Sequence, residues 1–306
     1  MRIAVLFNPS SGRGKGADSA RECAAACERA GIHAEARSVR EVFAEDLRGL
    51  DAVAVAGGDG TLHHSLPMLL AAQVPVYHLP LGTENLFARE YGHSASPSGL
   101  VNALRAMSVV RVDVPELASR DVRRRFVIMT SVGPDAGLIH RVNANRTGPI
   151  THADYAKHLI GEAFEARLPV ISVRVDGAER VVRQRGMVVV ANSRHYALGI
   201  NLAHEASMVD GLVDAVFVPA AGALGVAVSM VASLARGVLP VDTGVQLYRG
   251  TRIEIEASGE NGPWPLQADG EAIEPGLTQG QDQPGRLEVR MPTDRLPVLV
   301  PFRAGA

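Results

Sequence analysis

The first 113 residues alternate between short apolar runs and helical patterns, and this alternation restricts the possible folds more than any other feature of the chain. The strand-like runs are RIAVLF, HAEARS, DAVAVA, VPVYHLPL and VVRVDV, and helical patterns cover residues 14–30, 61–72, 83–91 and 97–108. Strands that alternate with helices through short turns form a parallel, doubly wound sheet. Ligands of such a sheet bind at the carboxyl ends of its strands. We therefore predict an α/β domain over residues 1–113.

After about residue 114 the pattern changes to short strand-like runs, several of which alternate apolar and polar residues. They are RFVIMTSVG, VISVRVDG, GMVVVANS, LVDAVFVP, RIEIEAS and RLEVRMP, and helical patterns occur only near residues 152–166 and 222–236. This pattern is typical of a mostly antiparallel β-sandwich, predicted here over residues 114–295. The closing LPVLVPF predicts a strand within residues 296–306 that could return to either domain. A ligand is expected in a cleft between the two domains.

Composition narrows the class of protein further. With 306 residues, 46% hydrophobic and 21% charged, the chain is typical of a folded soluble protein. A net charge of −2 argues against electrostatic binding of nucleic acid. Cys23 and Cys27 lie in a helical pattern, which predicts buried hydrophobic thiols and a reducing cytoplasm. The N-terminal apolar run is too short for a secretory signal.

Residues 215–235 carry no charge and are about long enough to span a bilayer. Pro219 and the glycines divide this segment. A buried strand followed by a core helix is therefore the preferred interpretation.

The stretch VAVAGGDGTLHHSL contains the strongest candidate site. Gly57, Gly58 and Gly60 permit backbone torsions and close approaches that side chains forbid. Thr61 can cap the following helix, whose N-terminal amides suit phosphate. Asp59 beside phosphates would require a metal ion or a supporting polar network. The alternative is an ordinary glycine-rich turn in which Asp59 is a polar cap.

Two further polar loops follow other predicted strands, namely NPSSGRGKG at residues 8–16 and LPLGTENLF at residues 79–87. In the first loop, Gly12, Gly14 and Ala17 loosely match a dinucleotide fingerprint with Glu35 as the ribose acid. The residues NPSS separate that strand from Gly12, which argues against the fingerprint. Three polar loops that follow strands of one sheet predict a nucleotide-binding surface.

These three loops resemble the nucleotide-binding loops of the diacylglycerol kinase catalytic-domain family. This family includes bacterial soluble lipid kinases and the sphingosine and ceramide kinases, and it is related to the NAD kinases. The resemblance continues through VVVANSRHYALG, EASMVDGLVDAVFV and LQADGEAI in the second predicted domain. It therefore spans nearly the whole chain.

The resemblance implies a set of functional residues and the cofactors ATP and Mg²⁺. The implied ATP contacts are Asn8, Pro9, Ser10, Ser11, Gly12, Ser38, Gly57, Gly58, Asp59, Gly60, Thr61, Leu62, His63, His64, Gly82, Thr83 and Asn85. Asp59, with Asp113, would organise magnesium beside the phosphates. Asp210 and the carbonyls of Ser207 and Leu212 would hold a structural magnesium ion. Glu271 is the implied general base, with Asp269 as its alternative.

The implied reaction is ATP-dependent phosphorylation of a lipid alcohol such as diacylglycerol. The family commonly has an acid where this chain has Leu86, which keeps a catalytically impaired nucleotide-binding regulator as an alternative. A second alternative is a small-molecule kinase similar to NAD kinase. His63 and His64 either shape the acceptor pocket or are surface or core histidines.

The remaining expectations concern location and partners. The arginines of SRDVRRRF, at positions 120 and 123–125, either meet anionic headgroups or lie in a solvated loop. We expect a cytoplasmic protein. If it contacts a membrane, we expect peripheral contact at the inner membrane surface. No nucleic-acid partner is expected, and family analogy alone suggests a homodimer.

Overall fold

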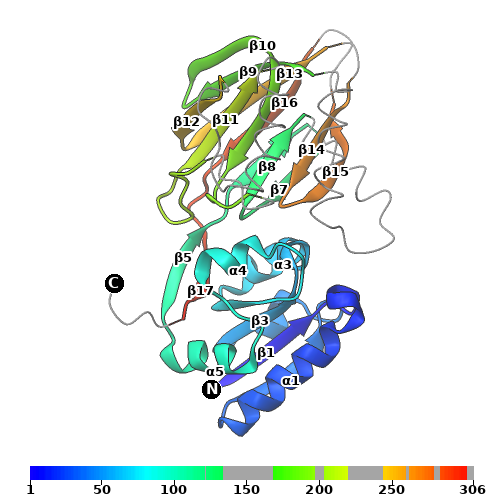
Figure 1. Ribbon diagram of the computed structural model, residues 1–306, viewed down its shortest axis with the longest axis vertical. Helices are drawn as coiled ribbons and strands as arrows, with labels where there is room; N and C mark the ends of the chain where they lie inside the picture. The colour runs from blue at the N-terminus through cyan, green and yellow to red at the C-terminus, as the bar shows by residue number, and fades with distance from the viewer. Residues whose placement is uncertain are drawn as a thin grey trace, which may run out of the picture. The chain divides into compact units, whose positions relative to one another are not determined.

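The computed structural model describes residues 1–120, 122–133, 168–196, 203–219, 244–259, 262–278 and 283–301, without the side chains of residues 12, 13 and 275. The described chain divides into two compact units (Figure 1). The first unit is Met1–Asp113 together with the described residues from Thr293 onward, and the second is Val114–Pro292. Each unit has its own sheet and core.

The first unit contains a six-stranded sheet in the order β2-β1-β3-β4-β17-β5. β1 to β4 are parallel, β17 extends the parallel set beside β4, and β5 closes the sheet antiparallel to β17. The closing segment of the chain thus returns to the first unit as a strand between β4 and β5. The elements are β1 (Arg2–Phe7), η1 (Ser11–Gly14), α1 (Gly16–Arg29), β2 (His33–Ser38), α2 (Ala44–Leu47), β3 (Ala52–Gly57), α3 (Asp59–Ala72), β4 (Val76–Pro80), α4 (Leu86–Tyr91), α5 (Pro97–Ala106), β5 (Val109–Asp113) and β17 (Arg295–Leu299).

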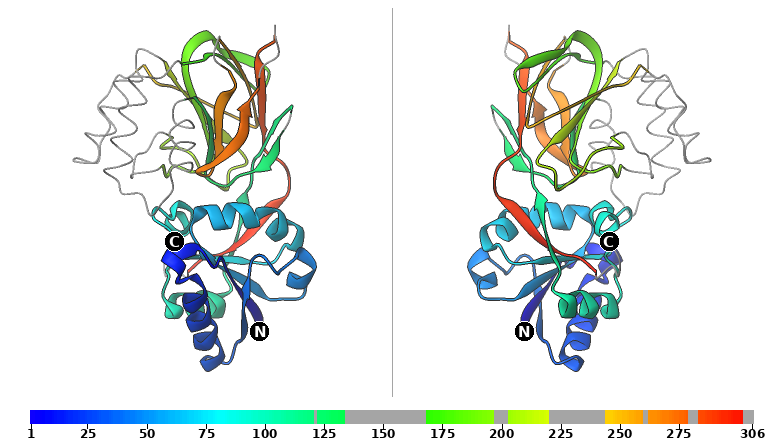
Figure 2. Two further views of the ribbon diagram at one scale, coloured as in Figure 1. Left: turned by 90° about the vertical axis from the view of Figure 1, so that its right-hand side faces the viewer. Right: turned by 90° about the vertical axis from the view of Figure 1, so that its left-hand side faces the viewer.

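Helices cover both faces of this sheet, as Figures 1 and 2 show: α1 and α5 lie on one face, and α3 and α4 on the other. Ala52, Ala54 and Ala56 of β3 pack in one cluster with Cys23 and Cys27 of α1. The intervening β3 residues are also fully buried. A strand buried on both faces is the hallmark of a doubly wound sheet, so the predicted α/β architecture is confirmed.

The second unit is a curled antiparallel sheet whose main path runs β15-β14-β8-β10-β9-β13-β16-β6-β7, with β11 and β12 added beside β10. The first half of the long strand β10 pairs with β9, and its second half pairs with β8 and β11. The strands are β6 (Glu116–Ser119), β7 (Arg123–Arg125), β8 (Met129–Val132), β9 (Val170–Val175), β10 (Ala178–Ala191), β11 (Val213–Pro219), β12 (Gln246–Gly250), β13 (Arg252–Ser258), β14 (Trp264–Ala268), β15 (Glu271–Leu277) and β16 (Gly285–Arg290).

Gly186 marks the point where β10 changes partners. A Cβ at this position would lie 2.3 Å from the carbonyl oxygen of Val218 and 2.8 Å from the ring of Phe217, so only glycine fits there. The two halves of the curled sheet enclose one hydrophobic core, to which Phe126, Phe217 and Trp264 contribute the largest side chains. The predicted sandwich-like antiparallel domain is therefore confirmed.

Several local expectations need correction or lie outside the description. Strands β6, β7, β12, β14 and β15 and the short helix α2 were not predicted, and Arg123–Arg125 form a strand instead of a loop. Of the uncharged segment 215–235, residues up to Pro219 form strand β11 and the rest lies outside the described residues. The predicted helices near 152–166 and 222–236 lie outside them as well. No helix in the described part of the chain is long and apolar enough to cross a membrane.

Candidate functional site

The polar loops of the first unit follow four neighbouring parallel strands. In the sheet order β2-β1-β3-β4, these strands end at Ser38, Phe7, Gly57 and Pro80, respectively. Because parallel strands present their carboxyl ends along one edge, the loops that carry most of the predicted ATP-contacting residues are brought into one row. Leu62, also a predicted contact, lies on α3 and is fully buried. Ser10 and Thr83 are exposed on this row, whereas Ser38 is buried, and its Oγ accepts the amide of Arg40 at 3.3 Å.

The first loop is held by its own polar side chains and by α3. Asn8 Oδ1 accepts both the amide of Ser10 at 3.1 Å and its hydroxyl at 2.7 Å. The hydroxyls of Ser11 and Thr61 lie 3.0 Å apart in a hydrogen bond, which joins the first loop to the start of α3. A Cβ on Gly16 would lie 2.5 Å from the carbonyl oxygen of Asn8, so this glycine allows α1 to begin against the loop.

Gly58 and Gly82 pack against each other where the second and third loops meet. A Cβ built on Gly82 would lie 2.6 Å from the Cα of Gly58, and one on Gly57 would lie 2.4 Å from Thr61 Oγ1. Gly58 has a φ of −90°. Close packing of one loop on another therefore requires glycine at Gly82, whereas a Cβ on Gly58 would lie at a less severe 3.1 Å from the Cα of Gly82.

Asp59 connects the second loop to the fourth helix. Its Oδ2 accepts the amide of Leu86 at 2.9 Å, and its Oδ1 accepts the amide of Phe87 at 3.2 Å. These amides open α4, where a carboxylate is favoured by the unpaired N–H groups and the helix dipole. The side chain of Leu86 is buried, but its backbone still bonds to Asp59.

Asn85 closes the third loop on itself. Its Oδ1 accepts the amide of Gly82 at 2.8 Å, and its Nδ2 donates to the carbonyl of Gly82 at 2.8 Å. Asn85 has a φ of 50° and directly precedes α4. Its side chain thus sets the shape of the loop that carries the exposed Thr83. Next to this loop, at the start of α3, His63 is buried and His64 is exposed, with ring centroids 5.4 Å apart.

Sequence reasoning missed two buried histidines behind these loops. His78 Nε2 donates to the carbonyl of Gly57 at 3.0 Å, and the amide of His78 donates to Nδ1 of His93 at 3.2 Å. His93 Nε2 donates in turn to the carbonyl of Leu299 at 2.6 Å. Burial lowers the pKa of His78, against the opposing charge of Asp59, and burial lowers the pKa of His93 to about 4. A histidine inside the apolar run VPVYHLPL was the available signal.

Asp113 lies on β5, with β4 and β17 between it and β3 in the sheet. It is fully buried, and its Oδ1 pairs with Nε of Arg295 at 2.7 Å. The registered pair Asp113–Arg295 joins the two strands through which the chain leaves and re-enters the first unit. An arginine therefore already neutralises this proposed magnesium-organising acid.

In the second unit, Glu271 follows a two-residue turn between β14 and β15. Ala268 and Glu271 pair across the turn, and Asp269 and Gly270 have φ values of 51° and 81°. Both central residues thus have the positive φ of a type I′ hairpin, for which Asp-Gly is a preferred sequence. Glu271 is partly exposed, while Asp269 is buried. Asp269 accepts the amides of residues 127, 128 and 129.

The loop that carries Asp210 is also closed by a side-chain hydrogen bond. Asp210 Oδ1 accepts the amide of Leu212 at 3.0 Å. Nearby, Arg249 pairs with the buried Asp214 at 3.0 Å and donates to the carbonyl of Glu205 at 2.6 Å. Burial raises the pKa of Asp214, and the hydrogen bond to Arg249 opposes that shift. Arg249 thus links Glu205, which precedes Asp210 in the loop, to Asp214, which follows it.

The donors near Asp210 fit a hard cation. The exposed Asp210 carboxylate and the carbonyls of Ser207 and Leu212 would offer only oxygen ligands, which suit magnesium or calcium. Within the described ranges, no group of three or more His, Cys, Asp or Glu side chains is arranged for a metal ion. A metal at Asp210 would therefore depend on backbone carbonyls and water.

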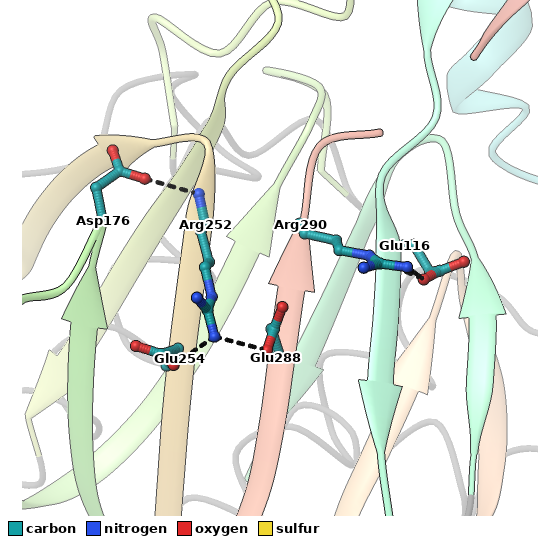
Figure 3. Close-up of polar contacts among 6 residues, drawn as sticks. All are labelled: Glu116, Asp176, Arg252, Glu254, Glu288 and Arg290. Carbon is teal, nitrogen blue, oxygen red and sulfur yellow. Dashed lines mark hydrogen bonds and ion pairs between the residues drawn. The ribbon is translucent and has the colours of Figure 1, made fainter. Parts of the chain in front are cut away.

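Two of the arginines considered for lipid headgroups, Arg123 and Arg125, lie near an acid of their own sheet, Glu116. Glu116 accepts hydrogen bonds from Nε and Nη2 of Arg290 at 3.0 and 2.6 Å (Figure 3). The same carboxylate lies 3.5 Å from both Arg123 and Arg125. One carboxylate is thus shared by three arginines, so the positive charge of this cluster is only partly matched.

Comparison with known proteins covers both units. Residues 2–117 match the family described as "Diacylglycerol kinase catalytic domain". Residues 128–291 match the "YegS C-terminal NAD kinase beta sandwich-like domain".

Two relatives and two solved structures illustrate the similarity. The chain is 26% identical over 222 residues to a "Diacylglycerol kinase" of Mycobacterium tuberculosis strain H37Rv, which covers 70% of this chain and 72% of the relative. It is 28% identical over 270 residues to a "Probable lipid kinase YegS-like" of Pseudomonas fluorescens, covering 84% and 82%.

The structural matches share the fold. A diacylglycerol kinase from Bacillus anthracis superposes with a TM-score of 0.67 at 15% identity, covering 98% of this chain and 96% of that one. An NAD kinase from Archaeoglobus fulgidus, solved with ATP, superposes with a TM-score of 0.55 at 18% identity, covering 98% and 94%.

Proposed function

Because the chain belongs to the diacylglycerol kinase catalytic-domain family, we propose that it transfers the γ-phosphoryl group of ATP to the hydroxyl of a lipid alcohol, most simply diacylglycerol. The observation that carries this proposal is the row of polar loops after β2, β1, β3 and β4. Three of these loops are fixed to one another through Ser11–Thr61, Gly58–Gly82 and Asp59–Leu86. Such a preorganised row suits a triphosphate.

In the proposed reaction the acceptor oxygen forms a bond to the γ-phosphorus while the bond from that phosphorus to ADP breaks. The Glu271 carboxylate accepts the proton that the acceptor hydroxyl loses. The loop amides and the exposed hydroxyls of Ser10 and Thr83 bind and orient the phosphates. Phosphoryl transfer depends mainly on such alignment and on charge neutralisation. When bound, magnesium supplies part of that neutralisation.

The residues proposed to hold magnesium are of two kinds. Asp59 is proposed to organise the ion beside the phosphates, while its carboxylate anchors α4. Asp113 is left out of this set because it already pairs with Arg295. Asp210, with the carbonyls of Ser207 and Leu212, is proposed to hold a structural ion that stabilises the turn before β11.

The acceptor is the part of this proposal that most needs a direct assay. The relatives named diacylglycerol kinase and lipid kinase favour a lipid. The assay follows transfer of labelled phosphate from ATP to diacylglycerol, sphingosine, ceramide and phosphatidylglycerol in detergent micelles, with NAD as a water-soluble acceptor. We expect a labelled lipid and no labelled NADP. Phosphorylation of NAD alone would replace the lipid acceptor by the alternative, and ATP binding without any transfer would favour a regulator.

The role of Glu271 has a matched control on the same strand. Glu271→Gln is expected to lower the rate of transfer about 10²–10⁴-fold, the usual contribution of a general base, while ATP binding by calorimetry is retained. Glu274→Gln changes another glutamate of β15 and is expected to keep the wild-type rate. A fully active Glu271→Gln enzyme would remove this residue from the mechanism.

The proposed structural ion is tested by magnesium binding in the absence of nucleotide. Asp210→Asn is expected to weaken binding at least 10-fold in equilibrium dialysis, because the variant loses the carboxylate charge that the site supplies. Asp176→Asn alters a different Asp-Gly turn in the same unit and is expected to bind as the wild type does. Equal binding by all three proteins would exclude Asp210 as a ligand.

A further inference from the structure

The turn before Glu271 is pinned by a buried glutamine. Gln267 is fully buried, and its Oε1 accepts the amide of Gly270 at 3.0 Å. Its Nε2 donates to the hydroxyl of Ser131 on β8 at 2.9 Å. The hydroxyl of Thr130 also donates to the carbonyl of Gln267 at 2.6 Å. One side chain therefore ties the centre of the turn to the neighbouring strand.

A second buried side chain holds the other half of the turn. The carboxylate of Asp269 accepts the amide of Val127 at 2.9 Å with Oδ2, and the amides of Ile128 and Met129 at 2.7 and 3.1 Å with Oδ1. The backbone amide of Asp269 donates to the carbonyl of Met129 at 2.9 Å. Both carboxylate oxygens are thus used to fasten the turn to residues 127–129.

The segment to which Asp269 is fastened is itself fixed. Asn192, at the end of β10, donates from Nδ2 to the carbonyl of Val127 at 2.9 Å. The amide of Asn192 donates to the carbonyl of Ile128 at 2.8 Å. Asn192 and Asp269 are both buried and engage the carbonyls and the amides, respectively, of one short stretch of chain. The hydrogen bonds that hold the turn therefore run from the end of β14, through residues 127–129 at the start of β8, to the end of β10.

The same unit contains an equivalent turn that carries none of the predicted site residues, which makes a useful comparison. Asp176 and Gly177 connect β9 to β10 with φ values of 49° and 82°. The carboxylate of Asp176 accepts the amide and hydroxyl of Thr251 at 3.0 and 2.9 Å and the amide of Arg252 at 2.9 Å (Figure 3). An Asp-Gly turn fastened by its carboxylate to a third segment is therefore used twice.

The two turns differ in the residues that flank them. In the sequence QADGE, the buried Gln267 stands two positions before Asp269, and Glu271 follows the glycine. In RVDGA, the corresponding residues are the exposed Arg174 and Ala178. The additional glutamine thus occurs at the turn that bears the proposed base.

We propose that Gln267 and Asp269 are positioning residues that act through Glu271, an inference that rests on the proposed function. Their hydrogen bonds keep the start of β15 in one place, so that the Glu271 carboxylate meets the acceptor hydroxyl in a reactive geometry. A displacement of about 1 Å can lower a rate 10²-fold. Asp269 is accordingly a support for the base and does not serve as a second base.

A double-mutant cycle separates this role from direct catalysis. Asp269→Asn and Gln267→Met are each made in the wild type and in Glu271→Gln. In the wild-type background we expect kcat to fall about 10–100-fold with an unchanged KM for ATP. In the Glu271→Gln background we expect no further fall, because residues that act through one group are not additive. The acid limb of the kcat–pH profile should persist in Asp269→Asn and vanish in Glu271→Gln.

A control variant and two readouts distinguish positioning from loss of stability. Asp176→Asn breaks the equivalent turn and is expected to lower the melting temperature while leaving kcat unchanged. The only tryptophan of the chain, Trp264, is buried on β14 and reports unfolding near the turn by its fluorescence. Amide exchange at Gly270, followed without substrate, should become at least 10-fold faster in Gln267→Met.

Three results would overturn the inference. Asp269→Asn could lower kcat by the same factor in both backgrounds, Asp176→Asn could lower kcat as much as Asp269→Asn, or Gly270 could exchange at the wild-type rate in Gln267→Met. Failure of the proposed function is recognised separately, as absence of lipid phosphorylation by the wild-type protein. The exchange measurement would still decide whether Gln267 holds the turn.

Discussion

The carboxylate of Asp59 accepts the backbone amide of Leu86 at 2.9 Å, although 27 positions separate these residues in the sequence. Together with the bond from Phe87, this contact makes the acid of the glycine-rich corner the N-terminal anchor of α4. The anchor uses the backbone of Leu86 and is therefore independent of its side chain. Replacement of the family's usual acid by leucine leaves this part of the site intact.

Asp59→Asn is expected to lower the free energy of unfolding by about 1–3 kcal/mol, because the carboxamide can accept only one of the two α4 amides. Chemical denaturation measures this change, and calorimetry should show weaker ATP binding. Asp51→Asn is the matched control, since Asp51 is exposed and accepts the amide of Arg2 at 2.6 Å. An equal effect of the two variants would show that anchoring of α4 is unimportant.

Gly82→Ala is expected to disrupt the junction of the second and third loops. Its Cβ would lie 2.6 Å from the Cα of Gly58 and 2.9 Å from Oδ1 of Asn85, so the backbone must shift. We expect a loss of about 1–3 kcal/mol in stability and at least 10-fold weaker ATP binding by calorimetry.

Gly31→Ala serves as the control for Gly82→Ala. Gly31 has a φ of 78° with no atom within 4 Å of its Cβ position, so only backbone strain of about 1 kcal/mol is expected, with unchanged ATP affinity. Wild-type ATP affinity of Gly82→Ala would contradict the role of this contact.

Acid should destabilise the first unit through His93. Burial lowers the pKa of His93 from 6.5 to about 4. Between these values the unfolded chain binds more protons than the folded chain, so stability falls as the pH falls from 6.5 and levels off below 4. The loss should approach about 3 kcal/mol. Denaturation curves of the wild type and His93→Gln measure it.

The His93→Gln variant should show a smaller slope of stability against pH between 4 and 6.5. His204→Gln, which changes an exposed histidine of the second unit, should keep the wild-type slope. An unchanged slope in His93→Gln would mean that another group dominates acid unfolding.

The two cysteines should be inert in the folded protein. Both are buried, and burial raises the pKa of each thiol to about 11. At pH 8 roughly one thousandth of each thiol is then the reactive thiolate. Labelling by iodoacetamide, followed by mass spectrometry, should therefore be slow in buffer and rapid in denaturant. Rapid labelling under native conditions would show that α1 opens readily.

Much of the architecture was predictable because hydrophobic periodicity is local. The strands RIAVLF and DAVAVA and the helix after residue 14 follow from patterns within a few residues. Strands β14 and β15 were missed because WPLQA and EAIEPGL contain proline or acids and lack clear alternation. β15 pairs with β14 across the turn, but β14 itself pairs with β8, which is more than 130 residues distant in the sequence.

The residues of the candidate site likewise divide into those that the sequence predicts and those that it does not. The glycine-rich corner and the QADGE motif were visible in the sequence because such turns require particular residues at adjacent positions. The buried histidines His78 and His93 were not identified, because a histidine in a strand gives no indication of the carbonyls that will surround it. The arginine that pairs with Asp113 was equally hidden, since it lies on the returning strand β17.

The sequence by itself determined the fold class, the positions of the polar loops and the family resemblance, because these depend on residue types at short spacing. Only the tertiary structure decided what the three Asp-Gly dipeptides of the second unit, at residues 176, 210 and 269, do. Asp210 stays exposed in its own turn, Asp176 fastens a neighbouring strand, and Asp269 is buried against residues 127–129. The physical reason is that a carboxylate's partners are backbone amides supplied by whichever segment packs beside it, and packing joins residues far apart in the chain.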